Sequence, residues 1–495
     1  MSEKVDTFII GAGPAGLTAA YTLVQKSKKV LIIERDPKYV GGISRTVSYK
    51  DFLFDIGGHR FFSKSKEIND LWHEILPNDF LKRKRLSRIF YDGKFYSYPL
   101  KGFEALYNLG ILTSIQCLLS FFWARIFPIK PAKSFHQWIR NEFGEKLFNI
   151  FFRTYTEKVW GMSCDEISAD WASQRIKGLS LGKAILSAFF KNFRTGRIKT
   201  LTDEFDYPRK GPGMMWNAVS LKVVEKSGQI FMGHELVSLK KNNVTGEWIV
   251  VICNKNNDKK EFIARDVISS APIPELLSKI IPVPKSLIVG EKLKYRDYLT
   301  VVLIVKKKDL FPDNWIYIHD SSVKVGRIQN YRSWSPELVP DPELSSLGLE
   351  YFCFENDDLW SLKDDALKEL AIHEICKIGL IEKENVIDFC VVRQSKAYPV
   401  YDDYYKQRLS EIRKDIMINY EGLHLVGRNG MHKYNNQDHA MMTGILTAKN
   451  ILLGKNIYNV WGVNEDAEYH ESVDNENEGH ITERMVPKKI KDNYL

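Results

Sequence analysis

A glycine-rich turn near the N-terminus constrains the fold more than any other feature. Residues 5–10 are an apolar run that ends at Gly11-Ala-Gly13-Pro-Ala-Gly16, and apolar residues at helical spacing follow over residues 17–24. A second apolar run, residues 30–33, ends at Glu34. This order of strand, tight turn, helix, strand and acidic residue is typical of a dinucleotide-binding βαβ unit.

Each part of this unit has a physical task. We expect Gly11 to permit the turn, Gly13 to let the backbone approach a pyrophosphate, and Gly16 to let the helix pack closely on the strand. Glu34 would accept hydrogen bonds from ribose hydroxyls. A glycine-rich turn alone could be an ordinary strand-to-helix connection, but here all the parts are in register.

Two further glycine pairs indicate which dinucleotide is bound. Gly41-Gly42-Ile43-Ser44 follows the acidic residue, and Asp55-Ile-Gly57-Gly58-His59 comes next. NAD sites rarely need such loops, whereas FAD lies extended along its domain and uses them to pass the pyrophosphate and the isoalloxazine. The sequence therefore predicts FAD.

The composition narrows the function further. The net charge is +9, with charges of both signs spread along the 495 residues, and no motif for nucleic acid is present. The six cysteines form no CxxC pair, so we expect neither a disulfide framework nor a metal site. The first strand begins almost at once, which leaves no room for a signal peptide, and a cytoplasmic location is the simplest expectation.

The pattern along the chain predicts an α/β fold with a discontinuous, doubly wound, Rossmann-like FAD-binding domain. We assign residues 1–75, 205–280 and 405–460 to that domain. Residues 76–204, with a hairpin at Asp92-Gly93, would be a mainly helical part of the substrate domain, and residues 281–404 its antiparallel sheet. Residues 465–495 are polar and are expected to form a mobile tail.

Residues 109–129 could contact a membrane. They are largely apolar but contain Arg125 and are followed by proline, so a spanning helix is the least favoured interpretation. An interfacial helix and a helix buried in the second domain both stay open, with the buried helix favoured. The interfacial alternative rests on the cations beside the aromatic residues, which are Lys101, Arg125 and Lys130.

Several blocks resemble the flavoprotein superfamily of amine oxidases, protoporphyrinogen oxidases, phytoene desaturases and UDP-galactopyranose mutases. The blocks most similar to the eukaryotic-type mutases are Gly57-Gly58-His59-x-x-Phe62-Ser63, Lys158-Val159-Trp160, Trp171-x-x-x-Arg175, Arg327 with Ser335-Pro336, Tyr398-Pro399, and Asn436-Gln437-Asp438-His439. The last block is the most specific. The resemblance covers nearly the whole chain.

This resemblance implies a reaction in which N5 of a reduced flavin attacks the anomeric carbon of a sugar diphosphate, and the resulting adduct opens and recloses as a furanose. Arg175 and Arg327 would bind the diphosphate because guanidinium pairs bidentately with phosphate oxygens. His59 would lie beside the isoalloxazine. Tyr98, Tyr317 and Tyr398 would surround the nucleotide and diphosphate.

The remaining residues implied by the resemblance serve the base and the cofactor. Lys101 stands where the mutases have a uracil-recognising glutamine, which leaves the base open. The cofactor-binding set comprises Gly11, Gly13, Ala15, Gly16, Glu34, Arg35, Gly42, Ser44, Gly57, Gly58, Val237, Gly427, Arg428, Asn436, Gln437 and Asp438. Each arginine could instead lie on the surface, and each tyrosine could serve packing alone.

Three hypotheses for the function stay open. The first is a mutase-like enzyme whose sugar diphosphate is carried by a nucleotide or by a lipid. The second is an FAD-dependent oxidoreductase that removes hydride from an apolar, amine or lipid-linked substrate. The third is an escort protein that has lost the flavin, which the intact glycine set argues against. Without a second GxGxxG unit, the reductant would be NAD(P)H visiting the flavin site or another protein.

Overall fold

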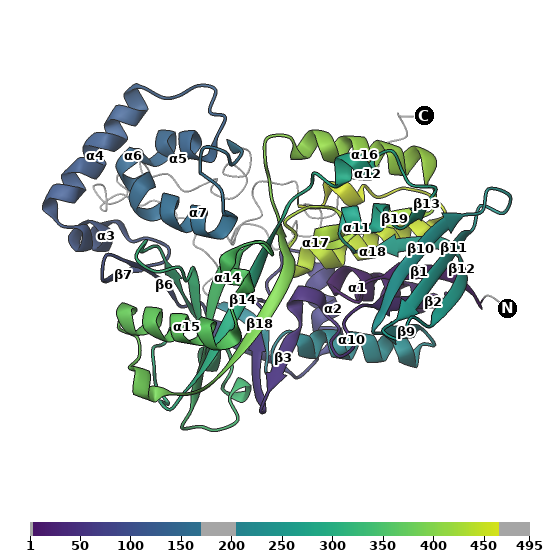
Figure 1. The fold of residues 1–495 in the computed structure, drawn as a ribbon, viewed down its shortest axis with the longest axis horizontal. Helices are drawn as coiled ribbons and strands as arrows, with labels where there is room; N and C mark the ends of the chain where they lie inside the picture. Colours follow the sequence, from purple (N-terminus) through teal and green to yellow (C-terminus); the bar gives the residue numbers. More distant parts are fainter. Residues whose placement is uncertain (1–2, 170–203, 465–495) are drawn as a thin grey trace.

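The computed structural model describes residues 3–169 and 204–464. One large sheet lies at one end of the molecule, the second lies in the middle, and a group of helices projects beyond the second sheet (Figure 1). The predicted Arg175, the end of the helical stretch and the polar tail lie outside the described residues. The mixed α/β architecture agrees with the fold class expected from the sequence.

The first sheet has the order β13-β10-β11-β12-β1-β2-β9, and β19 pairs with β12. β1 runs parallel to β12 and β2, and β2 runs parallel to β9, as expected for a doubly wound domain. The strands are β1 (Glu3–Ile10), β2 (Val30–Glu34), β9 (Gln229–Met232), β10 (His234–Lys241), β11 (Trp248–Asn254), β12 (Lys259–Ser269), β13 (Ile280–Ile281) and β19 (Leu423–Leu425).

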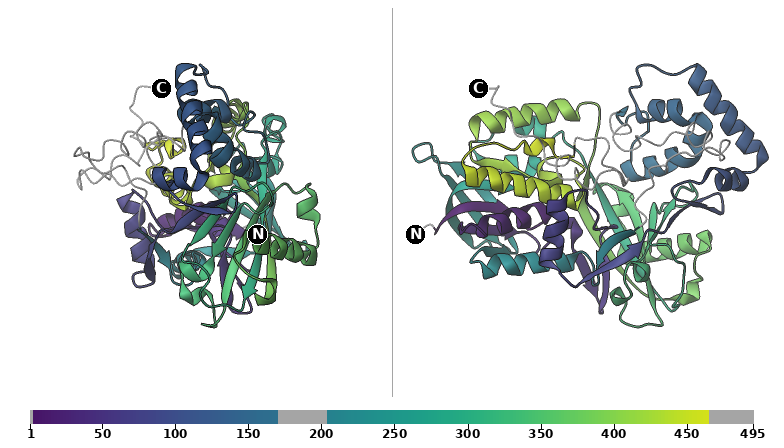
Figure 2. Two further views of the ribbon diagram at one scale, coloured as in Figure 1. Left: turned by 90° about the vertical axis from the view of Figure 1, so that its left-hand side faces the viewer. Right: turned by 180° about the vertical axis from the view of Figure 1, so that it is seen from behind.

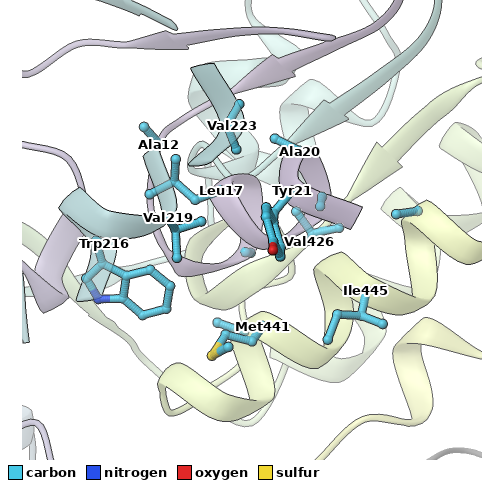
Figure 3. Packing of buried hydrophobic residues seen from close by; sticks show 14 of the residues in the cluster. Ala12, Leu17, Ala20, Tyr21, Trp216, Val219, Val223, Val426, Met441 and Ile445 are labelled. Atoms are coloured by element: carbon cyan, nitrogen blue, oxygen red, sulfur yellow. The ribbon is translucent and has the colours of Figure 1, made fainter. Parts of the chain in front are cut away.

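Three helices cover one face of this sheet: α1 (Pro14–Val24), α10 (Gly213–Glu225) and α18 (Gln437–Leu453). Figure 3 shows Leu17 and Tyr21 of α1 in one apolar cluster with Val219 of α10 and Met441 of α18. The helices α1 and α18 cross closely because Gly444 has no side chain, and a Cβ there would lie 2.3 Å from the Ala15 carbonyl oxygen. α11 (Ile273–Leu277), α12 (Leu287–Gly290) and α16 (Tyr405–Asn419) pack on the other face.

The second sheet has the order β18-β14-β17-β16-β15-β6-β7. Five of its strands, β14 to β18, come from residues 281–404, where an antiparallel sheet was expected, and the hairpin β6–β7 extends it because β6 pairs in parallel with β15. The strands are β6 (Ser87–Tyr91), β7 (Lys94–Ser97), β14 (Tyr295–Val305), β15 (Trp315–Ile318), β16 (Arg327–Asn330), β17 (Ser345–Cys353) and β18 (Val386–Pro399). The helix α15 (Asp364–Ile378) packs on this sheet.

The helical part contains α3 (Gly102–Leu109), α4 (Ile111–Ile126), α5 (Phe135–Phe143), α6 (Glu145–Phe148), a π-helical turn (Asn149–Arg153) and α7 (Thr154–Trp160). Ser134 caps α5, because its hydroxyl accepts a hydrogen bond from Gln137 N at 3.2 Å. The Gln137 side chain accepts from Lys133 N, one residue before the cap. Figure 2 shows these helices at the end of the molecule opposite the first sheet.

Short elements connect these parts. They are β3 (Thr46–Tyr49), β4 (Phe52–Asp55), α2 (Lys66–Ile75), β5 (Phe80–Lys84), β8 (Glu204–Pro208), α13 (Tyr331–Trp334), α14 (Asp358–Ser361) and α17 (Gly427–Gly430). Within residues 3–169 and 204–464, no helix has the length and apolar character needed to span a bilayer.

The contact at Gly444 leads to a test. A valine there would press its side chain into the α1 backbone, and we expect the free energy of unfolding in urea to fall by about 1–3 kcal/mol, as overpacked cores do. Leu453→Val on the exposed side of the same helix is the control, because Leu453 is 53% exposed. Equal losses in the two variants would contradict the close crossing.

Candidate functional site

The glycine-rich turn is built as the βαβ pattern predicts. Gly11 has φ = +98°, and a Cβ on it would lie 2.3 Å from Ser270 Oγ. A Cβ on Gly16 would lie 2.0 Å from the carbonyl oxygen of Gly11. Neither position can therefore hold a larger residue without moving the first turn of α1.

Bare backbone lines the entrance to α1. A Cβ on Gly42 would lie 3.5 Å from the Cα of Gly13, so the two glycine backbones approach each other closely with no side chain between them. Ser44 is buried at the end of the 3-10 turn Gly42–Ser44. Because α1 begins at Pro14, the N–H groups of Ala15 and Gly16 are the first free donors of the helix, and they suit a pyrophosphate.

Glu34 lies at the end of β2, beside the glycine-rich turn. Its Oε2 accepts from Ala12 N at 2.8 Å, and its Oε1 accepts from Asp36 N at 3.0 Å, which fixes the carboxylate toward the glycine turn. Burial raises the pKa of Glu34, against the effect of these two hydrogen bonds. Each oxygen keeps accepting capacity for a ribose hydroxyl. By contrast, Arg35 is 61% exposed and pairs with Glu275 at 3.6 Å, on the outside.

Val237 lies at a β-bulge. The register between β10 and β11 shifts between Leu236 and Ser238, which leaves Val237 outside the ladder. Its backbone groups are therefore not committed to the neighbouring strand, as a contact to the cofactor would require.

The N-terminus of α18 forms a second cofactor-facing end. Asn436 caps the helix in a capping box with His439, and the Gln437 amide donates to the Arg60 carbonyl at 2.9 Å. Asp438 is 2% exposed, and its Oδ2 has no hydrogen-bond partner among the described residues. Burial raises the pKa of Asp438 to about 7. An unsatisfied buried oxygen at this position fits a site that a polar ligand completes.

Arg428 joins this end to the second sheet. Its Nε donates to the Asn435 carbonyl and its Nη1 to the Ala397 carbonyl, each at 3.0 Å. The guanidinium lies 5.4 Å from the ring centroid of Tyr398 and 5.0 Å from that of Tyr434. Gly427, with φ = +77°, sits so close to α1 that a Cβ would lie 3.1 Å from the Ala15 methyl.

Arg327 is the centre of the site. Its Nε donates to Oε2 of the fully buried Glu350 at 2.5 Å, and Glu350 Oε1 accepts from the Gln329 amide at 2.8 Å. Burial lowers the pKa of Arg327, but the Glu350 carboxylate and the neighbouring tyrosine hydroxyls together outweigh this effect and hold the pKa well above its ordinary value. Among the described residues, Glu350 is the only hydrogen-bond partner of the Arg327 side chain. The terminal Nη groups are therefore available to a ligand.

The loop of Gly57, Gly58 and His59 lies against these groups. A Cβ on Gly57 would be 3.6 Å from Arg327 Nη2, and one on Gly58 would be 3.3 Å from the Gln329 amide nitrogen. His59 Nδ1 lies 3.0 Å from the Gly57 carbonyl oxygen. Desolvation, together with the charges of Arg428 and Arg327, lowers the pKa of His59 to about 3. His59 is therefore neutral near pH 7, and its Nδ1 donates to that carbonyl.

Aromatic rings surround Arg327. Tyr317 is its direct neighbour across the β15–β16 pair, and the Tyr98 ring lies 5.1 Å from the Tyr317 ring. The hydroxyls of Tyr398 and Tyr155 also lie close enough to influence the Arg327 charge. The structure thus brings all three predicted tyrosines to one place.

Two more arginines stack on the same aromatic group. Arg60 and Arg85 lie 5.4 and 5.6 Å from the ring centroid of Trp315, and Arg85 also lies 5.4 Å from the Tyr98 ring. Together with Arg327 and Arg428, they give the site several guanidinium groups held by rings, which suits an anionic ligand.

Other predicted residues are not brought together with these. Lys101 is exposed at the N-cap of α3, three residues after Tyr98, and no contact joins it to Arg327 or its ring of tyrosines among the described residues. Arg175 lies outside those residues. The sequence did not identify Glu350, Gln329 or Tyr155. A lone acidic residue in the apolar strand β17 was the signal that could have identified Glu350.

Asp55 precedes the loop of Gly57, Gly58 and His59 and fixes its position. Its carboxylate accepts from the Tyr207 hydroxyl at 2.5 Å and from Thr46 Oγ1 at 3.3 Å, and its carbonyl accepts from the Tyr331 hydroxyl at 3.1 Å. Burial raises the pKa of Asp55 to about 8, in spite of these hydrogen bonds.

Comparison with known proteins supports the dinucleotide domain. A model described as an NAD(P)-binding Rossmann-like domain matches residues 9–75. An inactive all-trans-retinol 13,14-reductase from Danio rerio is 46% identical over 55 residues, which are 11% of this chain and 9% of that protein. A protein assigned as a flavin-containing monoamine oxidase A from Dictyostelium discoideum is 27% identical over 120 residues, 23% of this chain and 26% of that one. The chain thus matches about a tenth of the length of the first relative and about a quarter of the length of the second.

Solved structures resemble the whole fold. A reduced UDP-galactopyranose mutase superposes with a TM-score of 0.78 and 22% identity, over 90% of this chain and 94% of the other. A protein assigned as a protoporphyrinogen oxidase from Exiguobacterium superposes with a TM-score of 0.69 and 16% identity, over 92% of this chain and all of the other. Putrescine oxidase bound to putrescine superposes with a TM-score of 0.62 and 16% identity, over 91% of this chain and 99% of the other. At these identities the likeness establishes the fold.

The contrast between Glu34 and Arg35 gives a direct test. We expect Glu34→Ala to weaken FAD retention about tenfold or more, because a charge-assisted hydrogen bond is lost and Ala12 N loses its acceptor. The measurement is the flavin absorbance that stays with the protein through gel filtration. Arg35→Ala is the matched control and should retain flavin like the wild type; a loss equal to that of Glu34→Ala would contradict the placement of Arg35.

The buried Asp55 carboxyl gives a pH test. From about pH 4 to about pH 8 the folded state keeps this proton and the unfolded state does not, so the proton contributes stability that is lost as pH rises. We expect the unfolding free energy of the wild type, relative to Asp55→Asn, to fall with pH by up to about 1.4 kcal/mol per unit. Urea titrations across this range measure the difference, and a flat difference would contradict the raised pKa.

Proposed function

We propose that the protein is an FAD-dependent enzyme that interconverts the pyranose and furanose forms of a sugar diphosphate. The cofactor is FAD and the protein is a flavoenzyme. The bare backbone at Gly13 and Gly42 and the unsatisfied Asp438 carboxyl oxygen fit a dinucleotide that is held by two helix N-termini. When reduced, the flavin would supply the nucleophile for the anomeric carbon.

One observation carries the mutase proposal. Arg327 presents its terminal nitrogens beside His59, while Glu350 fixes its Nε. A guanidinium held in this way suits the phosphate oxygens of a leaving diphosphate, because it stays charged and can donate two parallel hydrogen bonds. Arg175, by the resemblance, would be a second phosphate ligand.

The other residues take roles that match their surroundings. His59 is neutral, so it leaves the positive potential to the arginines, and its unprotonated Nε2 can accept a hydrogen bond beside the cofactor ring. Tyr98 and Tyr317 offer a ring surface for the nucleotide or sugar. The carrier of the diphosphate is a nucleotide or a lipid, and the reductant is NAD(P)H or another protein.

An FAD-dependent oxidoreductase is the second candidate, and the likeness to a monoamine oxidase and to putrescine oxidase favours it. Such an enzyme would take hydride from an apolar or amine substrate inside an aromatic cage. Tyr398 and Tyr434 are the obvious cage, but their rings stack at 5.4 Å with an interplanar angle of 16°. Rings in mutual contact leave no room for a substrate between them.

The deciding experiment uses the purified holoprotein. We expect dithionite-reduced enzyme to bind UDP-galactose more tightly than oxidised enzyme and to form furanose without net flavin oxidation. A flavin-containing protein that binds no UDP compound in either oxidation state, but whose flavin is reduced by an amine or apolar substrate, would support the oxidoreductase and contradict the mutase. Absence of a flavin spectrum, even after FAD is added, would contradict both enzymes and leave the escort protein as the remaining hypothesis.

The Arg327–Glu350 pair gives a residue-level test. We expect Arg327→Ala to raise the Kd for UDP about 10–100-fold, because charge-assisted hydrogen bonds are lost, and Glu350→Gln to raise it less. Asp313→Asn is the matched control, because the buried Asp313, just before β15, makes an ion pair with Arg88 of β6 in the same sheet. Unchanged UDP affinity in Arg327→Ala would refute the diphosphate role.

A further inference from the structure

The helices α3 and α4 expose an apolar face. Leu112 is 79% exposed and Trp123 is 61% exposed. The other large apolar residues on this surface, which we name the α4 face, are Tyr107, Ile111, Ile115, Leu119, Phe122, Ile126 and Phe127. A continuous exposed apolar surface of this size marks an interaction site in a folded protein.

The spacing shows that the face is built into the helix. Ile111, Ile115, Leu119, Phe122 and Ile126 recur every three or four residues and therefore line one side of α4. The opposite side, at Cys117, Phe121 and Ala124, is buried against the rest of the protein. The helix is thus folded and packed on one side, with the apolar face left outward.

The position of α4 presents this face to a partner. Figures 1 and 2 both place α4 at the outer edge of the helical part, at the end of the molecule away from the first sheet. A large flat partner could therefore approach the outward side of α4.

The charges around the face are complementary to an anionic surface. Between residues 99 and 133 there is a single acidic residue, Glu104, and its carboxylate is engaged by Ser97. The basic residues of the same segment, at both ends of the α4 face, are Lys101, Arg125, Lys130 and Lys133. Arg125 contacts Glu142 at 3.0 Å but stays 41% exposed.

We propose that the α4 face docks onto an anionic lipid bilayer, with α4 lying in the plane of the headgroups. The apolar side chains would enter the acyl boundary, tryptophan and tyrosine would lie at headgroup level, and the basic residues would meet lipid phosphates. The 16 residues of α4 are too few to cross the hydrocarbon core, which requires about 20.

A second copy of the chain suits this face less well. A symmetric dimer pairs the face with itself, and because both ends of the face are basic, the basic residues would meet basic residues of the second copy. Like charges at such an interface repel, whereas an anionic bilayer neutralises them. The inference is independent of the proposed function.

The test is co-sedimentation of the full-length protein with vesicles of phosphatidylcholine, with and without phosphatidylglycerol. We expect binding to the anionic vesicles that weakens with added salt. The double variant Leu112→Gln/Trp123→Gln should bind at least about tenfold more weakly, because two inserted apolar side chains are lost. The matched control is Leu221→Gln/Val224→Gln on α10, where Leu221 is 64% and Val224 52% exposed, and it should bind as the wild type does.

Three outcomes would overturn the proposal. One is failure of the wild type to bind anionic vesicles, and another is undiminished binding by the Leu112/Trp123 variant. The third is a wild-type dimer of the 57.4 kDa chain in sedimentation velocity that the same variant converts to a monomer, without vesicle binding, which would assign the face to a second copy. Circular dichroism and thermal unfolding of each variant establish that it is folded.

Discussion

The ion pair between Arg327 and Glu350 is the interaction on which the site depends. A carboxylate with no solvent exposure costs several kcal/mol to bury unless a partner compensates it. Here Arg327 and Gln329, two residues apart on the same face of β16, engage both of its oxygens. The carboxylate in turn fixes the plane of the guanidinium, which leaves the Nη groups directed at the loop of Gly57.

Sheet register creates this arrangement. Across three neighbouring strands Tyr317 pairs with Arg327, and Arg327 pairs with Glu350, so the three residues form one cross-strand row. A slip of one residue in β16 would turn Arg327 to the opposite face and leave Glu350 buried without a cation. The same pairing that stabilises the sheet therefore selects which residues face the cofactor loop.

Contacts between the predicted cofactor-binding loops and the second sheet hold these two parts of the molecule together. Arg45, just after the second glycine pair, donates to the Gln394 side chain on β18 at 2.7 Å. Asp55 is held by Tyr207 and Tyr331, and Arg428 by the backbone of Ala397. Because β18 carries Tyr398 beside these anchors, the site lies at the junction of the first and second sheets and not within either one.

Local patterns predicted part of this arrangement, because the βαβ unit and the sheet of residues 281–404 are encoded by patterns of consecutive residues. Pairings between distant residues were not predictable in this way. The strand β6 pairs with β15, more than two hundred residues later, and Glu350 contacts Arg327 only because of the register of β16 and β17.

The two faces of α4 connect the site to the surface of the molecule. Its buried Cys117 packs in the cluster that includes Tyr98 and Tyr317, while its other side is the α4 face. A single helix thus separates the site tyrosines from the surface that we propose meets a bilayer. A lipid-linked diphosphate keeps its phosphates at headgroup level, whereas a nucleotide diphosphate diffuses in water and gains nothing from a docked enzyme. Docking through α4 would therefore favour the lipid as the carrier, because Arg327 recognises the diphosphate that both carriers share and cannot distinguish between them.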